Sequence, residues 1–242
     1  MTAAAVHIKS EGFDQLYPAL RKKEGRIYSD EELLHLPNIA KDHPHYAEWQ
    51  MRKESCNRLK HYFKKRLSPL KILEAGCGNG WLAARLAEIP GSTITGIDVN
   101  YTELQQAERV FNHIPNLQFI LGSINTKEIE AAKYDFIVFA ASIQYFSSLK
   151  EIISQAMRKL KSDGEIHILD SSFYKPGEIS AAQKRTGNYY RDLGFPEMTE
   201  HYFHQSTGEL SSFRFKTLYQ PSFINRLSNY KNPFPWLCIK KQ

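Results

Sequence analysis

The stretch Lys71-Ile-Leu-Glu-Ala-Gly-Cys-Gly-Asn-Gly80 decides the fold of this chain of 242 residues. A short apolar run ends in an acid, and glycines then occupy positions 76, 78 and 80. Glycine can adopt positive φ and has no Cβ, so the backbone here can turn sharply and lie directly against a ligand. Apolar residues recur at helical spacing from Trp81 onwards, which predicts strand, turn and helix without a gap. In an open α/β sheet that junction lies at the carboxyl end of a strand, where ligands bind.

The glycine spacing separates this loop from two other nucleotide-binding patterns. The dinucleotide fingerprint reads G-x-G-x-x-G, and a P-loop ends in Lys followed by Ser or Thr. Here the pattern is Glu-x-Gly-x-Gly-x-Gly, with no such Lys. One glycine-rich loop is a weak signal alone, so the interpretation needs support from the strands further along the chain.

Further strands are predicted at regular intervals along the chain. Asp98 ends the second strand 24 positions after Glu74, where this architecture places a carboxylate on ribose hydroxyls. The alternative for Asp98 is a helix cap, although Asn100 or Thr102 can fill that role. Residues 160–165 predict a helix exit and a turn, and residues 180–193 a helix that ends at Gly194. The predicted strands after the first are residues 93–98, 117–123, 134–142, 166–170, 215–219 and 236–240.

This series resembles the class I S-adenosylmethionine-dependent methyltransferases, closely over roughly residues 71–172. The resemblance implies a Rossmann-like α/β fold, doubly wound around a mostly parallel seven-stranded sheet. It also implies an N-terminal helical cap (residues 1–69) and a cofactor-binding domain (residues 70–242) with an insertion around residues 174–212. The implied activity is methyl transfer from S-adenosylmethionine, releasing S-adenosylhomocysteine, without a metal.

The resemblance also implies a set of cofactor contacts. Glu74 would approach the methionine ammonium, Asp98 the ribose hydroxyls, and the Ala140 carbonyl the ammonium again. The family usually has an Asp after the third strand, whereas this chain has Ser123, which leaves Ser123, Ile124 or Asn125 for the adenine amino group. The predicted cofactor-binding residues are Arg52, Glu74, Gly76, Cys77, Gly78, Asp98, Val99, Ser123, Ile124 and Ala140.

Arg52 belongs to a predicted helix from His45 to Arg66. The apolar stripe of this helix consists of Trp49, Cys56, Leu59 and Phe63, and its outer face carries Lys53, Lys60 and Lys64. Arg52 interrupts the stripe, so its guanidinium must snorkel, form an ion pair or bind an anion. Both alternatives stay open at this point: an internal ion pair, or contact with the carboxylate of the bound methionine moiety.

The acceptor side of the site is less clear. Residues 141–146 read Ala-Ser-Ile-Gln-Tyr-Phe rather than the Asn-Pro-Pro-Tyr of the family's exocyclic-amine and glutamine modifiers. Gln144 and Tyr145 are candidate acceptor-site groups, with an ordinary connection as the alternative. His201 and His204 are candidate bases, with a packing role as the alternative. The favoured acceptor is a small molecule, and the alternatives are RNA, a protein, or a cofactor-binding subunit without chemistry.

Composition limits the possible partners. The net charge is +6, and residues 1–71 hold 14 Lys or Arg against 9 Asp or Glu. These cations are dispersed on one helix face among acids, so a nucleic-acid partner is disfavoured. The isolated Cys56, Cys77 and Cys238 indicate neither disulfides nor a zinc site. Without a membrane-length apolar run or a signal-peptide layout, we expect a cytoplasmic protein without a membrane partner, whose oligomeric state the sequence leaves open.

Overall fold

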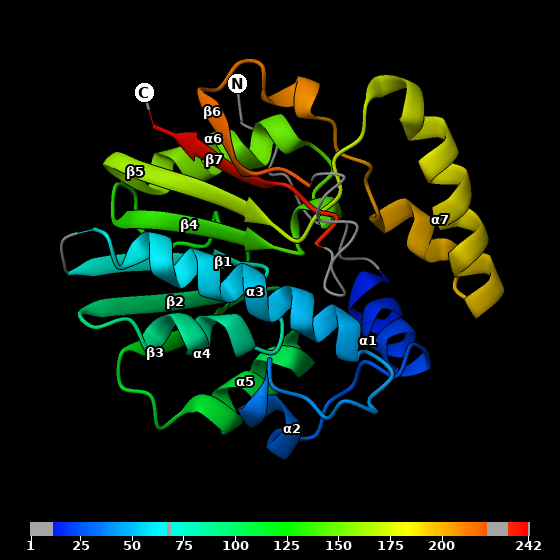
Figure 1. Cartoon of the computed structure of the whole chain (residues 1–242), viewed down its shortest axis with the longest axis horizontal. Helices are drawn as coiled ribbons and strands as arrows, with labels where there is room; N and C mark the ends of the chain where they lie inside the picture. The colour runs from blue at the N-terminus through cyan, green and yellow to red at the C-terminus, as the bar shows by residue number, and fades with distance from the viewer. Residues whose placement is uncertain (1–11, 67–68, 222–231, 242) are drawn as a thin grey trace.

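The glycine loop joins β1 (Leu70–Ala75) to α4 (Trp81–Ala87), as predicted, and β1 is an inner strand of one sheet, between β2 and β4 (Figure 1). The computed structural model describes residues 12–66, 69–221 and 232–241. Seven strands are hydrogen-bonded in the order β3-β2-β1-β4-β5-β7-β6. The other strands are β2 (Ser92–Asp98), β3 (Leu117–Leu121), β4 (Tyr134–Ala140), β5 (Leu160–Leu169), β6 (Phe215–Tyr219) and β7 (Trp236–Lys240).

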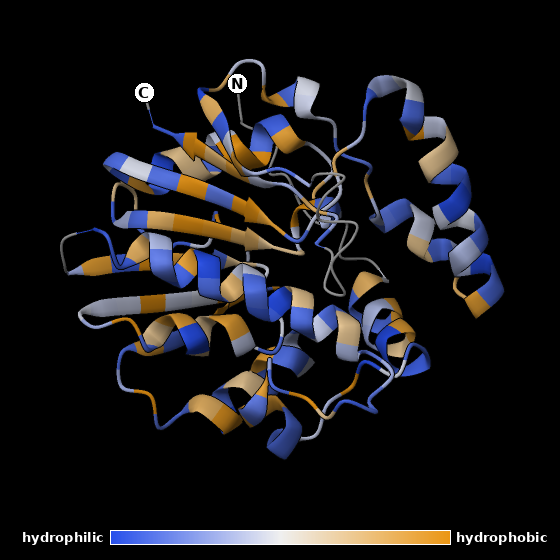
Figure 2. Ribbon diagram, viewed as in Figure 1, coloured by the Kyte–Doolittle hydropathy of each residue, from blue (hydrophilic) through white to orange (hydrophobic). Residues whose placement is uncertain are grey.

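The strand directions confirm the predicted mostly parallel sheet. β1 to β5 pair in parallel, whereas β7 runs antiparallel to both β5 and β6. β1 and β4 are almost completely buried, because helices cover both faces of a parallel sheet. Figure 2 shows these central strands as largely hydrophobic, while the surrounding helices mix polar and apolar residues.

Alternate residues of each strand supply two separate cores. In β1, Ile72 packs with residues of α3, α4 and α5, whereas Leu73 packs with residues of α6 on the opposite face. The sheet is therefore doubly wound, as predicted. The helices are α1 (Phe13–Lys23), α2 (Asp30–His35), α3 (Tyr46–Phe63), α5 (Tyr101–Phe111), α6 (Leu149–Lys159) and α7 (Ile179–Leu193), with short 3-10 turns η1 (Ile143–Tyr145), η2 (Pro176–Glu178), η3 (Pro196–His201) and η4 (Thr207–Leu210).

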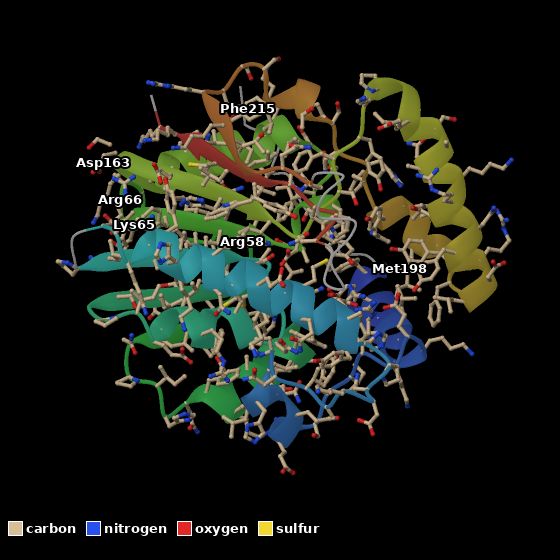
Figure 3. The ribbon with its side chains drawn as sticks, in the orientation of Figure 1. Arg58, Lys65, Arg66, Asp163, Met198 and Phe215 are labelled. Atoms are coloured by element: carbon tan, nitrogen blue, oxygen red, sulfur yellow. The ribbon has the colours of Figure 1, made fainter. Side chains whose placement is uncertain are left out.

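A third, smaller core joins the N-terminal helix to the region after β5. Phe13 and Leu20 of α1 pack with Tyr190 of α7 and with Met198 of η3. Figure 3 shows Met198 between α1 and α7. This contact holds α1 and α7 together at the edge of the sheet where β1, β4 and β5 end (Figure 1).

Several predicted elements begin or end one to three residues away from the observed ones, as at the ends of β3, β4 and α3. Two further local predictions differ from the structure. Residues 160–165 were expected to turn but begin β5, because Leu160 is buried and pairs with Tyr134, and a bulge before Phe136 absorbs the irregular register. The Trp49 stripe of α3 is buried as predicted, but Lys60 does not simply face solvent. Its ammonium pairs with Glu88 at the end of α4, at an Nζ to Oε2 distance of 2.5 Å.

No helix of the described residues is both long enough and apolar enough to cross a membrane.

Candidate functional site

The glycine loop is locked between the ends of β2 and β4. All three loop glycines adopt positive φ, between 53° and 75°. The amides of Gly76 and Cys77 both donate to the Ile97 carbonyl, at 2.8 and 3.0 Å. A Cβ on Gly76 would lie 2.5 Å from the Cβ of Ser142, whose hydroxyl donates to the Ala75 carbonyl at 2.7 Å. The sequence therefore needs glycine here both for φ and for space.

Asp98 braces this loop from the end of β2. Its Oδ2 accepts from the Gly78 amide at 2.7 Å, and its Oδ1 accepts from the Asn100 amide at 2.8 Å. Burial raises the pKa of the Asp98 carboxyl, while these backbone donors favour its ionised form. Asn100, not Asp98, caps α5 by accepting from the amides of Thr102 and Glu103, as the sequence allowed. The ribose contact of Asp98 stays a prediction.

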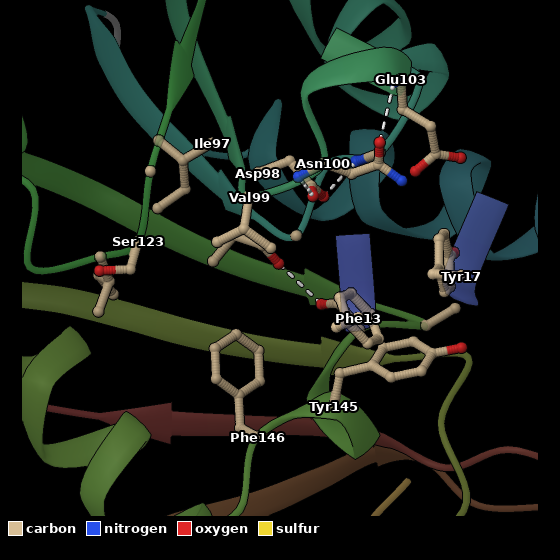
Figure 4. Close-up of a pocket in the computed structure, with 17 residues that line it drawn as sticks. Phe13, Tyr17, Ile97, Asp98, Val99, Asn100, Glu103, Ser123, Tyr145 and Phe146 are labelled. Carbon is tan, nitrogen blue, oxygen red and sulfur yellow. Dashed lines mark hydrogen bonds between the residues drawn. The ribbon is translucent and has the colours of Figure 1, made fainter. Parts of the chain in front are cut away.

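A first pocket opens beside Asp98 at the ends of β1, β2 and β4 (Figure 4). One wall is apolar and comes from the ends of β2 and β3 and from the turn after β4, and α1 closes the opposite side. Its lining includes the predicted residues Gly76, Gly78, Asp98, Val99, Ser123 and Ile124, together with Phe13, Tyr17, Glu103, Tyr145 and Phe146.

Glu103 is a second carboxylate in this pocket, which the sequence analysis did not single out. Burial, and after it the charge of Asp98, raises the pKa of Glu103 to about 7. Its position in the first turn of α5 concealed it, because an acid there is ordinary helix chemistry.

A second pocket continues from the first along the glycine loop, and it contains the remaining predicted residues Arg52, Glu74, Cys77 and Ala140. Glu74 is buried, and its Oε2 has no hydrogen-bond partner among the described residues. Burial, followed by the charge of Asp98, raises the pKa of Glu74 well above its ordinary value. A buried acceptor without a donor is costly, so this atom suits a cationic ligand group.

A chain of alternating charges forms the far wall of the second pocket. Arg21 pairs with Glu24 at 2.7 Å, and Arg26 reaches both Glu24 at 3.3 Å and Glu48 at 2.6 Å. Arg52 completes the chain by pairing with Glu48 at 3.0 Å. Three guanidinium groups thus share two carboxylates, so this chain of ion pairs by itself has one excess positive charge, next to the buried carboxyls of Glu74 and Glu103 in the same pocket. Arg52 has the ion pair that was one predicted alternative and also lines the pocket, so its ligand contact stays a prediction.

Helix α1 covers both pockets with one face. Phe13, Tyr17 and Arg21 are spaced four residues apart, and the rings of Phe13 and Tyr17 pack against Tyr145 at centroid distances of 5.7 and 5.5 Å. The Arg21 guanidinium donates to the Tyr145 hydroxyl at 2.9 Å. The four-residue spacing was the only sequence signal for this contact.

A third, larger cavity of about 530 Å³ adjoins the second pocket. It lies between α1, α3, α7 and the segments after β4 and β5, and polar groups and tyrosines line most of it. Both predicted acceptor-site groups Gln144 and Tyr145 are in its wall. The Gln144 amide is already engaged, because Nε2 donates to the Ala141 carbonyl at 2.7 Å and Oε1 accepts from the Ser171 hydroxyl at 3.1 Å.

The two candidate histidines do not line any of these three pockets. His201 is buried against Phe13, with ring centroids 5.4 Å apart. His204 lies within hydrogen-bonding distance of the Thr186 hydroxyl, at 2.9 Å, and burial lowers its pKa. These positions favour the packing role that was their alternative.

A cluster with metal-ligand chemistry lies on the α3 face of β5, where β5 pairs with β7. Glu165, His167 and Cys238 bring their potential ligand atoms within 4.8 Å of one another, a proximity that sequence spacing did not reveal. Arg66 and Lys240 already contact Glu165 at 2.7 and 3.1 Å. A divalent cation would compete with these two positive charges, so the ion pairs account for the cluster without a metal.

The strand order, the glycine loop after β1 and the connected pockets define a Rossmann-like α/β protein built to hold a nucleotide-like ligand at the carboxyl ends of β1, β2 and β4. Residues 67–218 match the family model described as a methyltransferase domain. The chain belongs to this methyltransferase-domain family.

Named relatives differ in the substrates that they use. The malonyl-[acyl-carrier protein] O-methyltransferase of Halalkalibacterium halodurans is 38% identical over 100 residues, which cover 40% of this chain and 37% of that protein. The demethylmenaquinone methyltransferase of Chlorobaculum tepidum is 28% identical over 100 residues, covering 41% and 40%. The chain thus spans less than half the length of these relatives. A putative sarcosine dimethylglycine methyltransferase from Galdieria sulphuraria shares the fold, with a TM-score of 0.59, 16% identity and coverage of 96% and 98%.

Proposed function

We propose that this protein transfers a methyl group from S-adenosylmethionine to a small-molecule acceptor. The observation that carries the proposal is the line of three connected pockets, with Ala141 in the wall of all three. The first suits a nucleoside, the second an amino acid, and the third has room for a second substrate. A sulfonium between nucleoside and amino acid would then lie beside Ala141.

The residues present fit this cofactor at each end. Val99 and Ile124 offer apolar surfaces for adenine, and Asp98 offers a carboxylate at the strand end where ribose binds in this architecture. The Glu74 carboxylate, with its unpartnered buried oxygen, would accept from the ammonium. The unmatched positive charge of the Arg21, Arg26 and Arg52 chain would meet the carboxylate.

Bound S-adenosylmethionine supplies an already activated methyl group. The protein is then required mainly to hold the acceptor in line with that methyl and to keep water out. Phe13 and Tyr17 of α1 close the cofactor side, and Tyr145 separates the first pocket from the cavity. In this proposal residues 1–69 act as a cap. The inserted region around residues 174–212 supplies Arg185, Tyr189, Tyr190 and Tyr202 to the acceptor wall.

Calorimetry with S-adenosylhomocysteine and 5′-methylthioadenosine tests the cofactor assignment. Both ligands carry the nucleoside, but only S-adenosylhomocysteine has the ammonium and carboxylate. We expect both to bind the wild type, the first more tightly, and Glu74→Gln to weaken only S-adenosylhomocysteine. Absence of S-adenosylhomocysteine binding by the wild type would refute the proposed function.

A further inference from the structure

We propose that Asp170 takes up the proton of the acceptor during methyl transfer. The acceptor is then a compound whose nucleophile carries a proton, such as a hydroxyl or a protonated amine, rather than a carboxylate. This inference rests on the proposed function and names the substrate class for the same site.

Asp170 lies where the cofactor pockets open into the acceptor cavity. It directly follows β5, as Ala141 follows the neighbouring β4, and the Ala141 amide donates to the Leu169 carbonyl at 3.0 Å. Ala141 lines all three pockets, and Asp170 lines the third. The two residues are therefore neighbours across the strand ends, at the point that the methyl group must cross.

The backbone at both positions is strained in the same way. Ala141 has φ 53° and Asp170 has φ 52°, in the left-handed region that side chains disfavour. Apart from these two, Ala132 alone among the described non-glycine residues has positive φ. Strain of this kind persists where the surrounding structure enforces it, and it concentrates at functional sites. Here the two strained residues follow adjacent strands and border the same cavity.

The Asp170 carboxylate is held by one oxygen only. Its Oδ1 accepts from the Ser55 hydroxyl at 2.6 Å and from the Asn232 side-chain amide at 3.3 Å. No hydrogen bond among the described residues uses Oδ2, and Asp170 lines the third cavity. Among these residues one oxygen is therefore fixed, and in this proposal the other accepts a proton from a ligand.

Other charged groups shift the pKa of Asp170 without forming an ion pair with it. Burial raises the pKa of Asp170, and the charges of Arg52 and Arg58 on α3 oppose that rise. The other titratable groups that line the cavity come from α1 and the segment after it, from α3, η1 and α7, and from the segment after η3: Arg21, Glu24, Arg26, Glu48, Tyr145, Arg185, Tyr189, Tyr190 and Tyr202. Arg52 itself is paired with Glu48 at 3.0 Å, so Asp170 has no direct ion pair among the described residues.

The proposed step balances without any further reactant. The acceptor oxygen or nitrogen forms its new bond to the methyl carbon while the carbon–sulfur bond breaks and its electron pair returns to sulfur. The proton of the acceptor passes to Oδ2 of Asp170 and later leaves to solvent. A protonated amine transfers this proton before the new bond forms, because its nitrogen has no lone pair until then. A carboxylate acceptor would need no such proton acceptor, because it is already ionised at neutral pH.

The first experiment identifies the acceptor class through the product. Wild-type protein is incubated with a dialysable metabolite pool and S-adenosylmethionine labelled in the methyl group, and the labelled product is treated with alkali. Methyl ethers and methylamines keep the label, whereas methyl esters release it as volatile methanol. We expect an alkali-stable product. An alkali-labile product would overturn the inference and leave the proposed function intact, whereas no transfer despite S-adenosylhomocysteine binding would overturn both.

The second experiment uses Asp170→Asn with the acceptor isolated through its label. Asparagine tolerates the same φ and can still accept from Ser55, so the structural role is kept and only the basic oxygen is lost. We expect kcat to fall by about 10²- to 10⁴-fold, with the acid limb of the pH profile abolished. S-adenosylhomocysteine affinity and melting temperature should change little.

Ser55→Ala is the matched control. It removes a hydrogen bond that favours the ionised Asp170 but keeps the carboxylate, so the acid limb should move to higher pH while activity above that limb persists. A purely structural Asp170 predicts the reverse pattern. Asp170→Asn would then keep its acid limb, and its activity would fall no more than its stability.

Discussion

Replacing Gly76 by alanine should be among the most damaging single-methyl changes in this protein. The added Cβ would lie 2.5 Å from the Cβ of Ser142, far inside van der Waals contact. The loop cannot withdraw, because the amides of Gly76 and Cys77 both donate to Ile97. Ser142 is equally fixed by its hydrogen bond to the Ala75 carbonyl. Both partners of the clash are therefore held by hydrogen bonds of the site itself.

The structure offers a control that separates conformational strain from the clash. Gly194 ends α7 with φ 87°, close to the φ of 75° at Gly76, and a Cβ there would meet nothing within 4 Å. Gly194→Ala should therefore cost only the left-handed conformation, about 1–2 kcal/mol. Gly76→Ala adds overpacking of about 1–3 kcal/mol, for a total of about 2–5 kcal/mol. That is a large part of an ordinary domain's stability of about 5–15 kcal/mol.

Urea denaturation at equilibrium measures the free energy of unfolding of both variants, and calorimetry measures their affinity for S-adenosylhomocysteine. A double variant with Ser142→Gly should recover part of the loss at Gly76, since the clashing atom is gone. Gly194→Ala should retain ligand affinity. Equal losses for the two alanine variants, or no recovery in the double variant, would refute the argument that close approach of backbone to Ser142 fixes the loop.

Three further predictions concern charged groups of the cofactor pockets. Asp98→Ala should weaken S-adenosylhomocysteine and 5′-methylthioadenosine alike by about 1–3 kcal/mol in calorimetry, and unchanged affinity would remove the ribose assignment. Arg52→Met should weaken the binding of S-adenosylhomocysteine but not that of 5′-methylthioadenosine. The melting temperature should change little, because Glu48 keeps its ion pair with Arg26 at 2.6 Å. A loss of stability without a loss of affinity would assign Arg52 to the ion pair alone. Burial, and after it the charge of Asp98, raises the pKa of Glu103 from 4.5 to about 7, so the folded protein holds a proton that the unfolded chain releases. The free energy of unfolding should fall as pH rises through that interval. Glu103→Gln should reduce this fall in urea titrations, and the remainder should come from the buried carboxyls of Glu74, Asp98 and Asp170, whose pKa values are also raised. An unchanged pH dependence would show that Glu103 does not contribute.

Most of the fold followed from the sequence because parallel strands and glycine loops leave local signals. The central strands β1 and β4 are mainly apolar, since helices cover both of their faces. The last two strands were predicted at the residues where they occur, because turns and polar residues bound them. All ten predicted cofactor-binding residues line the first two pockets, since strand ends in such a sheet converge on one edge.

The start of β5 was missed for a physical reason. The turn signal in residues 160–165 is real in composition, but burial of Leu160 against the sheet outweighs it. Pairing of Lys161 with Asp135 at 2.8 Å adds a second long-range contact. Local propensity is a weak prior where tertiary packing supplies a buried partner.

Two of the residues that sequence reasoning missed at the site, Arg21 and Asp170, have partners that are remote in the chain. Arg21 meets Tyr145 across 124 positions, and Asp170 meets Ser55 across 115. Within its own segment, Arg21 is an ordinary cation in the last turn of a helix, and Asp170 is an ordinary acid after a strand. The four-residue spacing of Phe13, Tyr17 and Arg21 places Arg21 on one face of α1 but does not indicate what that face contacts, and Asp170 has no such spacing. Only the packing of α1 and α3 onto the strand ends therefore reveals what each side chain faces. The cofactor pockets and the acceptor cavity differ in how well the sequence predicted them, for the same reason. The cofactor pockets are formed mainly by the strand ends and loops of one sheet, whereas the acceptor cavity is assembled from α1, α3 and α7, whose contacts no local pattern records.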